Sequence, residues 1–518
     1  MTRRKFLTYG AAAPMALSLL GARAFAATPG ELASTTSATP AGLDSKAIAN
    51  LIKAIRGPVI LPRDHAYDAR RRVYSWNPVT DKFPALIVRC ANQSDVVQSI
   101  AFAHANKLEV AVRGGAHDIQ GSSVCGGGMV IDLSPMKHIA IDRDAQIAHV
   151  GPGVTAGELN TAAHLYGLAA CLGCDPGPGV SGVSLGGGMG WLMAKYGAAC
   201  DNLVSAEVVT ADAQSQVASA ERNQELFWAL RGGGGNFGIV TGFEFKLHPV
   251  KKVFGGFLAY PVSQARQFYA AYRELMAMAP DELVVETVSM AAYEGIPFRQ
   301  PIVMAIACYC GDPQAGEQIL KPLRSLSQPL ADSIGVIPYT ALQRHPPLSV
   351  GRVLLGNKGV GSVAIKPLNR SLQYNHWKAS AIENLTDAAI DTLVGRIEGA
   401  PRGWMIGVGH HMHGAVSRVD SSETAFVRRP GFSYFFEEDW FDPAEADAAM
   451  AWVDRSWDAM QPYSHEGTYV NFLSVTGDDA VKMTYGANYP RLALLKSRYD
   501  PDNFFHLNRN IKPSREPA

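Results

Sequence analysis

Between residues 84 and 250, short apolar runs alternate with amphipathic stretches. The apolar runs predict strands at residues 85–89, 108–113, 129–133 and 147–150. The amphipathic stretches predict helices at residues 94–106 and 156–166, after a short helix at 46–56. Glycine-rich loops follow several of these elements, at residues 114–115, 126–128, 186–190 and 232–238. This alternation predicts an α+β domain over residues 57–250.

The pattern changes at Lys251, where the loop glycines become sparse and the amphipathic stretches lengthen. Helices are predicted at residues 263–278, 312–326 and 380–397, and strands at 302–310, 404–413 and 432–440. We therefore predict a second domain over residues 251–465, built as an antiparallel sheet covered by helices. Short β and turn patterns return near Thr468, so residues 466–518 are expected to fold back on the first domain.

Composition and charge exclude several classes of protein. Of the 518 residues, 47% are apolar and 18% are charged, which is typical of a folded globular chain. Lys+Arg and Asp+Glu are equal at 47 each, so no basic surplus predicts nucleic-acid binding. The seven cysteines are too sparse, and odd in number, to predict a disulfide framework. No segment after the N-terminal leader is apolar enough to predict stable membrane insertion.

Residues 1–26 have the pattern of an export signal: a Thr-Arg-Arg-Lys head, an apolar run and an Ala-Phe-Ala site. The apolar run is shorter than the roughly 18–20 residues of a membrane span. We expect cleavage after Ala26, with Ala27 as a close alternative, then a tether and a short helix over residues 27–56. Paired arginines followed by x-Phe-Leu resemble a twin-arginine signal, which implies export to the periplasm or beyond. An arginine-rich start to a cytosolic protein is the alternative.

The loop from Arg113 to Asp118 follows a predicted strand and reads Arg-Gly-Gly-Ala-His-Asp. Successive small residues expose backbone N–H groups, and such a concave backbone suits an anion. His117 would then lie beside the anion or the group attached to it. The alternative is a polar turn with a surface histidine.

The segment Gly233-x-Gly235-x-x-Gly238 matches the spacing of a dinucleotide-binding loop. Such a loop should follow a strand and open a helix. Here residues 225–230 predict a helix before the loop, and residues 239–246 alternate like a strand after it. The order is reversed, so we reject the Rossmann interpretation.

The cysteine and histidine pairs do not predict a metal site. Cys171-x-x-Cys174 precedes Asp-Pro-Gly-Pro-Gly, which cannot open the helix that a thioredoxin-like pair requires. Zinc would need a second ligand pair, and the pairs at 308–310 and 411–413 lie far along the chain on predicted strands. The alternative for each lone cysteine is a small buried apolar residue.

Four segments follow one another in an order that one family shares. They are Val112–His117, Gly182–Trp191, Leu226–Thr241 and a tail from Tyr469-Val-Asn471 to Asn508-Arg-Asn510. Together they resemble the berberine-bridge-enzyme-like FAD-linked oxidoreductases of the vanillyl-alcohol oxidase superfamily. The resemblance implies an α+β fold in which a PCMH-type FAD-binding domain is split in two and the substrate domain is inserted before the tail.

The resemblance also implies that His117 bonds covalently to the 8α-methyl group of the flavin. The residues expected to bind FAD are Arg113, Gly114, Gly115, Ala116, His117, Asp118, Cys174, Gly186, Gly187, Gly188, Gly238, Ile239, Val240, Asn508 and Asn510. Ala116 departs from the family, which usually has glycine there. Cys174, the candidate for a second covalent bond, lies twelve residues before Gly186 instead of the usual eleven. Attachment through His117 alone and attachment through both side chains therefore remain open.

The reaction implied is hydride transfer from a substrate C–H bond to the flavin while a base takes a proton. Tyr469 is the first candidate base, and Asn471, predicted on the same strand face, would contact the flavin or orient Tyr469. Glu437 is the second candidate, because relatives project an acid/base side chain from a strand after a Thr-Ala-Phe-x-x-Arg segment, here residues 424–429. An exposed acid at a sheet edge is the alternative for Glu437.

The expected substrate is a small organic molecule, namely an alcohol, a sugar, or an amine-bearing or aromatic metabolite. Met189 stands where sugar- and alcohol-oxidising relatives use a tyrosine, which implies different pocket chemistry. Dioxygen is the expected electron acceptor, with hydrogen peroxide as product, and a periplasmic electron carrier is the alternative. A flavin-binding protein without turnover is a third hypothesis, which the intact His117 and tail segments disfavour.

Overall fold

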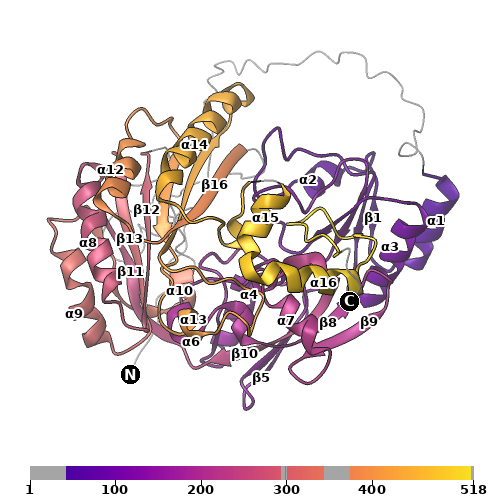
Figure 1. Cartoon of the computed structure of the whole chain (residues 1–518). Helices are drawn as coiled ribbons and strands as arrows, with labels where there is room; N and C mark the ends of the chain where they lie inside the picture. The colour runs from indigo at the N-terminus through magenta and orange to yellow at the C-terminus, as the bar shows by residue number, and fades with distance from the viewer. Residues whose placement is uncertain (1–42, 293–297, 299, 344–373, 476, 515–518) are drawn as a thin grey trace, which may run out of the picture. The chain divides into compact units, whose positions relative to one another are not determined.

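The computed structural model describes residues 43–292, 298, 300–343, 374–475 and 477–514 (Figure 1). These residues belong to one compact unit that spans Pro40–Ala518. The export signal predicted over residues 1–26 lies outside the described residues. No helix in the described part of the chain is both long and apolar enough to cross a membrane.

The first sheet carries the glycine loop that contains His117. It contains β1 (Val59–Ile60), β2 (Leu86–Arg89), β4 (Met129–Asp132) and β3 (Val110–Arg113), in this order, and β2, β4 and β3 are parallel. The helices α1 (Ser45–Ala54) and α3 (Gln93–Ala105) pack beside it (Figure 1). Leu86, Ile87 and Val88 are fully buried, as expected for a parallel strand covered on both faces. The 114–118 loop therefore starts from a fixed strand end.

The second sheet is antiparallel and completes the first domain. Its order is β5 (Ile139–Asp142), β6 (Ile147–Val150), β10 (Ile239–His248), β8 (Leu203–Val209) and β9 (Ser215–Ser219), and β7 (Ala169–Ala170) also pairs with β10. The accompanying helices are α4 (Ala156–His164), α5 (Val180–Leu185), α6 (Met193–Tyr196) and α7 (Gln224–Leu230). The helix α7 precedes the turn at 233–238, and the strand β10 follows it. This order agrees with rejecting the Rossmann interpretation.

The third sheet is antiparallel and belongs to the second predicted domain. Its order is β14 (Ala331–Asp332), β11 (Lys252–Pro261), β13 (Ile302–Tyr309), β12 (Leu283–Met290), β17 (Trp404–Gly409), β18 (Phe432–Trp440) and β16 (Tyr374–Ile382), and β15 (Gly335–Pro338) also pairs with β11. One face packs against α8 (Ala265–Ala277), α9 (Pro313–Arg324), α12 (Asp387–Gly395) and α14 (Ala446–Met460) (Figure 1). The predicted α+β fold with a helix-covered antiparallel sheet is confirmed.

The two faces of the third sheet have different neighbours because successive side chains on a strand point to opposite sides. Leu283 and Val285 of β12 join the core under the helices, whereas Val284 and Val288 join the core shared with the first domain. Glu286 has the parity of Val284 and Val288, so it faces the first domain as well. On β12, therefore, every second side chain points toward the first domain, and the side chains between them point toward the helices.

The C-terminal segment packs on the first domain through α15 (Asp478–Tyr485) and α16 (Tyr489–Tyr499). Lys496 in α16 is fully buried and donates hydrogen bonds to Asp500 at 2.6 Å, to the Asn236 carbonyl at 2.9 Å and to the Phe505 carbonyl at 2.9 Å. The Asn236 side chain accepts from the Ile511 backbone N–H at 3.0 Å. These contacts tie the tail to the turn before β10.

Three local predictions from the sequence are wrong. Residues 380–382 end β16 instead of starting a helix, because β16 pairs with β18 from Tyr374 to Ile382 and this tertiary pairing overrides the local helical pattern. The strand predicted over 404–413 ends at Gly409, where His410 turns the chain with φ +45°. Asn471 lies in the 3₁₀ helix η8 (Val470–Phe472), so it does not share a strand face with Tyr469.

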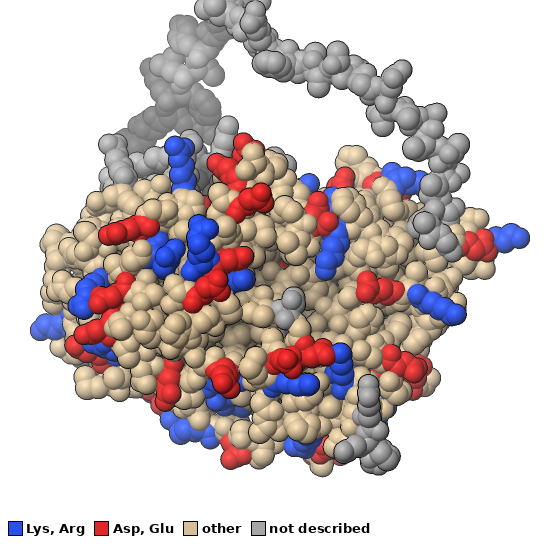
Figure 2. All heavy atoms as spheres, turned by 45° about the horizontal axis from the view of Figure 1, so that its top comes forward, with Lys and Arg blue, Asp and Glu red and all other residues tan. Residues whose placement is uncertain are grey.

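Other elements are short. They include the helices α2 (Tyr67–Arg71), α10 (Tyr339–Gln343) and α13 (Ala415–Arg418). On the face drawn in Figure 2, Lys and Arg side chains are interspersed with Asp and Glu side chains, in keeping with the balanced composition.

Candidate active site

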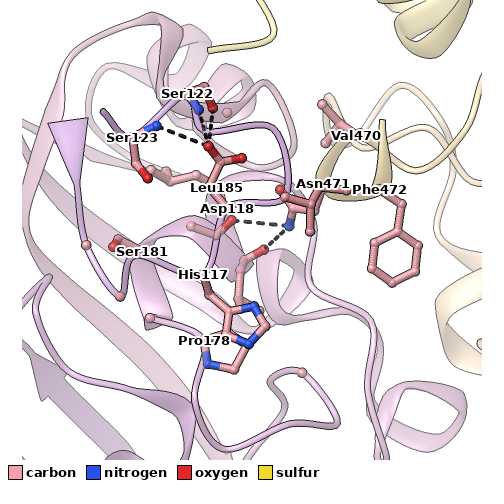
Figure 3. Close-up of a pocket in the computed structure, with 18 of the residues that line it drawn as sticks. His117, Asp118, Ser122, Ser123, Pro178, Ser181, Leu185, Val470, Asn471 and Phe472 are labelled. Atoms are coloured by element: carbon pink, nitrogen blue, oxygen red, sulfur yellow. Dashed lines mark hydrogen bonds between the residues drawn. The ribbon is translucent and has the colours of Figure 1, made fainter. Parts of the chain in front are cut away.

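A cavity of about 400 Å³ lies where loops of the first domain, the third sheet and the C-terminal segment meet. Its wall includes parts of the 114–119 and 173–183 loops, the 234–240 turn, β12, β18 and the 469–472 segment. Figure 3 shows His117 and Asp118 near Asn471 on this wall. Of the predicted site residues, the structure brings Gly114, Gly115, Ala116, His117, Asp118, Cys174, Gly238, Ile239, Val240, Glu437, Tyr469, Asn471 and Asn508 to the cavity.

The His117 loop has small residues because another backbone segment approaches it closely. A Cβ on Gly115 would lie 2.2 Å from the Gly179 backbone nitrogen, which no side chain tolerates. Ala116 has φ +56°, the left-handed conformation that favours glycine. Its departure from the family pattern therefore costs roughly 1 kcal/mol of conformational energy. His117 nevertheless remains on the cavity wall.

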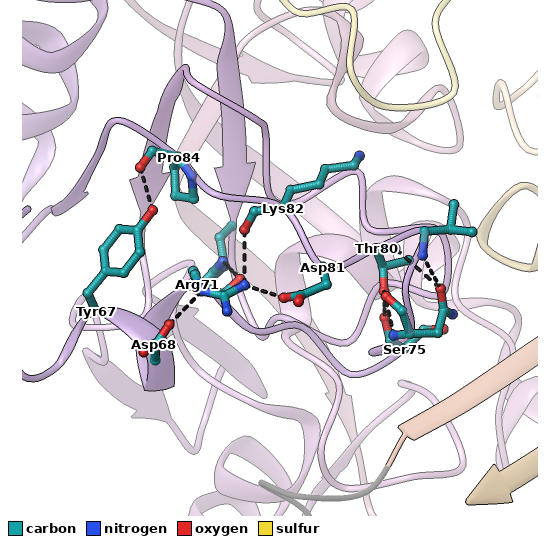
Figure 4. Close-up of polar contacts among 11 residues, drawn as sticks. Tyr67, Asp68, Arg71, Ser75, Thr80, Asp81, Lys82 and Pro84 are labelled. Carbon is teal, nitrogen blue, oxygen red and sulfur yellow. Dashed lines mark hydrogen bonds and ion pairs between the residues drawn. The ribbon is translucent and has the colours of Figure 1, made fainter. Parts of the chain in front are cut away.

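Tyr74 is a site residue that sequence reasoning missed. Its ring stacks on His117 at 3.9 Å with an interplanar angle of 16°, and its hydroxyl donates a hydrogen bond to Glu437 Oε1 at 3.3 Å. Nearby, Arg71 bonds Asp68 at 2.8 Å and also pairs with Asp81, which fixes the segment that carries Tyr74 (Figure 4). A tyrosine outside any predicted element gave no signal in the sequence.

Asp118 orders the loop beyond His117. It accepts hydrogen bonds from the Ser122 hydroxyl at 2.8 Å and from the Ser123 backbone N–H at 3.1 Å, and Arg509 lies 3.1 Å away (Figure 3). Burial alone would raise the pKa of Asp118, but the Arg509 guanidinium and hydrogen bonds from the Ser122 hydroxyl and the Gln120 backbone N–H lower it below its usual value. Asp118 therefore remains a carboxylate that holds Arg509 at the cavity.

Several groups on the wall fit a large polar cofactor such as FAD. The buried Ser123 Oγ, Asn508 Oδ1 and Arg509 Nε have no hydrogen-bond partner within the described part of the chain, and all three residues line the cavity. A Cβ on Gly235 would meet only the Asn508 side chain, at 3.6 Å, so the backbone there is open to a ligand. A pyrophosphate is bound by hydrogen-bond donors, and a flat ring needs backbone without side chains against it. The cavity wall offers both kinds of group.

Five predicted cofactor residues do not lie on the cavity wall. Arg113 is buried elsewhere, where its guanidinium donates to the carbonyls of Arg71 at 3.1 Å and Ser123 at 3.4 Å. Its long side chain therefore braces the chain beneath the loop. The others are Gly186, Gly187, Gly188 and Asn510.

Side chains from other parts of the protein pack directly against the backbone of the glycine turn at 186–188. A Cβ on Gly186 would lie 2.1 Å from Asn471 Oδ1, and one on Gly187 would lie 2.7 Å from the Phe426 ring. The Gly188 backbone N–H donates to the Tyr469 hydroxyl at 2.8 Å. The turn thus supports the cavity from behind and does not itself line it.

Tyr469 is held by two donors, the Gly188 backbone N–H and Asn471 Nδ2 at 2.7 Å. Burial raises the pKa of Tyr469 well above its usual value, although both hydrogen bonds lower it. A phenol in this state holds its proton at neutral pH. The base role of Tyr469 stays a prediction, and the geometry favours a hydroxyl that orients a ligand.

The third sheet contributes aromatic rings and carboxylates to the cavity. Trp377 lies 5.2 Å from Phe435 and 5.3 Å from Phe472, ring centroid to ring centroid. Glu437 is 3% exposed, and β18 has a partner strand on each side. The alternative of an exposed acid at a sheet edge is therefore wrong. Glu437 sits on the cavity wall with Tyr74 as its hydrogen-bond donor.

Glu286 and His410 also line the cavity, and the sequence analysis did not select them. A lone acid inside the apolar run of β12 was an available signal for Glu286. The histidines that were noted, His411 and His413, instead contact each other, and His413 Nε2 lies 3.0 Å from the Leu283 carbonyl. Burial lowers the pKa of His411 to about 4, as in a neutral structural histidine.

A cavity with glycine loops and a histidine on one wall, and acids with aromatic rings on the other, fits a flavin-linked oxidoreductase. The FAD binding domain profile matches residues 84–219, and the profile "Berberine and berberine like" matches residues 468–512. The chain is 30% identical to (R)-6-hydroxynicotine oxidase from Paenarthrobacter nicotinovorans over 479 residues, which are 89% of this chain and 97% of that one. The chain belongs to the berberine-like family of FAD-linked oxidoreductases.

Other similarities support the same family and fold. The uncharacterised FAD-linked oxidoreductase YgaK from Bacillus subtilis is 28% identical over 471 residues, 89% of this chain and 98% of that one. The crystal structure of 6-hydroxy-D-nicotine oxidase from Arthrobacter nicotinovorans superposes with a TM-score of 0.76 at 29% identity, covering 89% and 98% of the two chains. Xylooligosaccharide oxidase from Myceliophthora thermophila shares the fold, with a TM-score of 0.75 at 24% identity over 91% of this chain and all of that one.

Proposed function

We propose that this protein is an exported oxidase that carries FAD bonded to His117 and oxidises a small, amine-bearing aromatic substrate. One observation carries the proposal: a single cavity has the His117 loop on one wall and Glu437 with aromatic rings on the opposite, third-sheet wall. FAD, when bound, supplies the hydride acceptor. Dioxygen is the proposed final acceptor, with hydrogen peroxide as product.

Glu437 is proposed as the proton acceptor, with Tyr74 as its positioning residue. The Tyr74 hydroxyl donates a hydrogen bond to Oε1 and so orients the Glu437 carboxyl group. Tyr74 also stacks on His117, so it fixes the carboxylate relative to the proposed point of flavin attachment. The half-buried rings of Trp377, Phe435 and Phe472 pack together and limit the access of water to the proton transfer.

An amine is favoured over a sugar by the charges on the wall. Among the described residues, the third sheet's part of the cavity carries the carboxyl groups of Glu286 and Glu437 and no lysine or arginine. A protonated amine would donate hydrogen bonds to these carboxyl groups and would be attracted by the faces of the aromatic rings. The name of the relative (R)-6-hydroxynicotine oxidase points to the same class of substrate.

The substrate class is tested with three probes: N-methylbenzylamine, benzyl alcohol and cellobiose. Each is added without oxygen while flavin absorbance is followed, and peroxide is then measured in air. We expect the amine to bleach the flavin and air to restore the colour with release of peroxide. Bleaching by cellobiose alone would contradict the amine proposal, and bleaching without reoxidation by air would indicate a dehydrogenase.

Export by the twin-arginine route is proposed from residues 1–26, in particular Arg3 and Arg4. A route for folded proteins suits a chain that binds its cofactor before export. Replacement of both arginines by lysine should leave the protein, with its flavin, in the cytoplasm. If the same amount of this variant as of the wild-type protein is found in the periplasm, the twin-arginine route is wrong.

A further inference from the structure

Cys174, Glu286 and His410 bring a sulfur, an oxygen and a nitrogen atom together at the cavity wall. One such atom from each residue lies within 4.8 Å of the atoms from the other two. The Cys174 Sγ is 3.8 Å from His410 Nε2, and His410 Nδ1 is 3.2 Å from Glu286 Oε2. The three residues come from the loop after β7, from β12 and from the end of β17, so only the folded chain assembles them.

The spacing of these atoms is close to that of the ligands of a zinc ion. Zinc–ligand bonds of about 2.0–2.3 Å at tetrahedral angles place neighbouring ligand atoms roughly 3.3–3.6 Å apart. The distance from Cys174 Sγ to His410 Nε2 exceeds this range by only about 0.2 Å. Cysteine, histidine and glutamate are all zinc ligands in proteins, and three protein ligands leave a fourth position for water or another small ligand.

The surrounding structure holds the three side chains in place. A Cβ on Gly409 would lie 1.8 Å from Glu286 Oε2, so glycine at this position lets the carboxyl group reach His410. The His410 backbone N–H donates to Glu286 Oε1 at 2.8 Å. The Trp191 indole N–H donates to the Cys174 carbonyl at 2.9 Å, which fixes the backbone that carries the thiol. Ligands that are already held in position lose little freedom when an ion binds.

A divalent cation also suits the charges of these groups. Burial raises the pKa of Glu286 to about 8 and that of the Cys174 thiol well above its usual value, so both groups hold a proton at neutral pH. Burial lowers the pKa of His410 to about 4, so the imidazole is neutral and has a lone pair for a cation. A divalent cation that displaces the two protons leaves the net charge of the buried cluster unchanged.

We propose that Cys174, Glu286 and His410 bind one zinc ion, which competes with the substrate for the third-sheet side of the cavity. Binding of zinc requires only that Cys174 is not bonded to flavin. The competition rests on the proposed function, in which a protonated amine donates to Glu286. A zinc ion that takes the Glu286 oxygen as a ligand removes this acceptor, so zinc is a reversible inhibitor.

Binding is tested with the purified flavoprotein and cobalt(II), which replaces zinc in four-coordinate sites and absorbs visible light. Its absorption in such sites lies at longer wavelengths than that of oxidised flavin, so the two signals are separate. We expect one cobalt ion per chain and its displacement by excess zinc. Cys174→Ser and His410→Gly should each weaken binding at least about 100-fold. Glycine also suits the φ of +45° at position 410.

Cys171→Ser and His411→Ala are the matched controls, because neither residue is among those that line the cavity in the described part of the chain. Both variants should bind cobalt as the wild-type protein does. Thermal unfolding and flavin absorbance show that each variant is folded. The absence of a four-coordinate cobalt spectrum would overturn the proposal, as would unchanged binding in Cys174→Ser and His410→Gly. Peptide mass that locates the flavin on Cys174 would overturn it as well.

Competition with the substrate is measured as the rate at which N-methylbenzylamine bleaches the flavin without oxygen. We expect zinc to slow bleaching, and more amine or a chelator to restore it. In Cys174→Ser, zinc should no longer slow the reaction of that variant. Zinc binding without slower bleaching would overturn the competition. A protein that binds cobalt and zinc as expected but is bleached by none of the three substrate probes would defeat the proposed function and leave the zinc site supported, so the two failures are distinguishable.

Discussion

The wall of the cavity from the first domain presents mainly backbone, whereas the third sheet presents side chains. Gly114 and Gly115 are required because the 178–181 segment approaches within van der Waals distance. On the sheet, Glu286, Phe435 and Glu437 reach the cavity through strand parity alone. Backbone binds what is common to all flavins, and side chains select the substrate. The first wall should therefore tolerate little change, while the second should tolerate change at the expense of activity.

The largest effect on turnover is expected for Glu437→Gln. Loss of a general base typically lowers kcat by about 10²- to 10⁴-fold, while flavin content should remain normal. Glu438→Gln is the matched control, because Glu438 is equally buried but lies on the opposite face of β18, where it accepts from the Gly403 N–H at 2.9 Å. Equal losses in kcat for the two variants would contradict the role of Glu437.

The backbone wall is tested by Gly115→Ala. The new Cβ would meet the Gly179 backbone, so we expect a destabilisation of roughly 1–3 kcal/mol and loss of flavin incorporation. Gly126→Ala serves as the control, because nothing lies within 4 Å of its Cβ position. Flavin absorbance and thermal unfolding measure both variants. Full flavin content in Gly115→Ala would refute the close approach.

A smaller effect is expected for Tyr74→Phe, which keeps the ring stacked on His117 and removes the hydrogen bond to Glu437. Loss of a hydrogen bond to a charged group costs about 1.5–3 kcal/mol, so kcat/KM should fall roughly tenfold or more. Tyr374→Phe, outside the cavity, should leave kcat/KM unchanged. An unchanged kcat/KM for Tyr74→Phe would remove Tyr74 from the mechanism.

The smallest effect is expected for Ala116→Gly. Glycine relieves the left-handed conformation at φ +56°, so the variant should be more stable by up to ~1 kcal/mol in thermal unfolding. Ala163→Gly, inside the helix α4, should be less stable by about the same amount. Destabilisation by both substitutions would mean that the 116 position is not strained.

The two walls also differ in how far the sequence predicts them. The His117 loop, the turn before β10 and Tyr469-Val-Asn471 have local signatures, and all contribute to the cavity. Tyr74, His410 and Glu286 have none, because their positions depend on contacts across the fold. The apolar pattern at 380–382 fits helix and strand alike, and only pairing with β18 decides between them. The glycine turn at 186–188 is predicted from the family to lie along FAD, and its lack of side chains leaves space for Asn471 and Phe426, which the sequence did not indicate.

The central claim is that the cavity holds flavin bonded to His117 opposite Glu437. The most direct test is to denature the purified protein in acid, digest it and locate the flavin by peptide mass. The account predicts a flavin-bearing peptide that contains His117, and its loss in His117→Ala. Flavin that separates from the chain on denaturation, or that stays attached only elsewhere, would contradict the account.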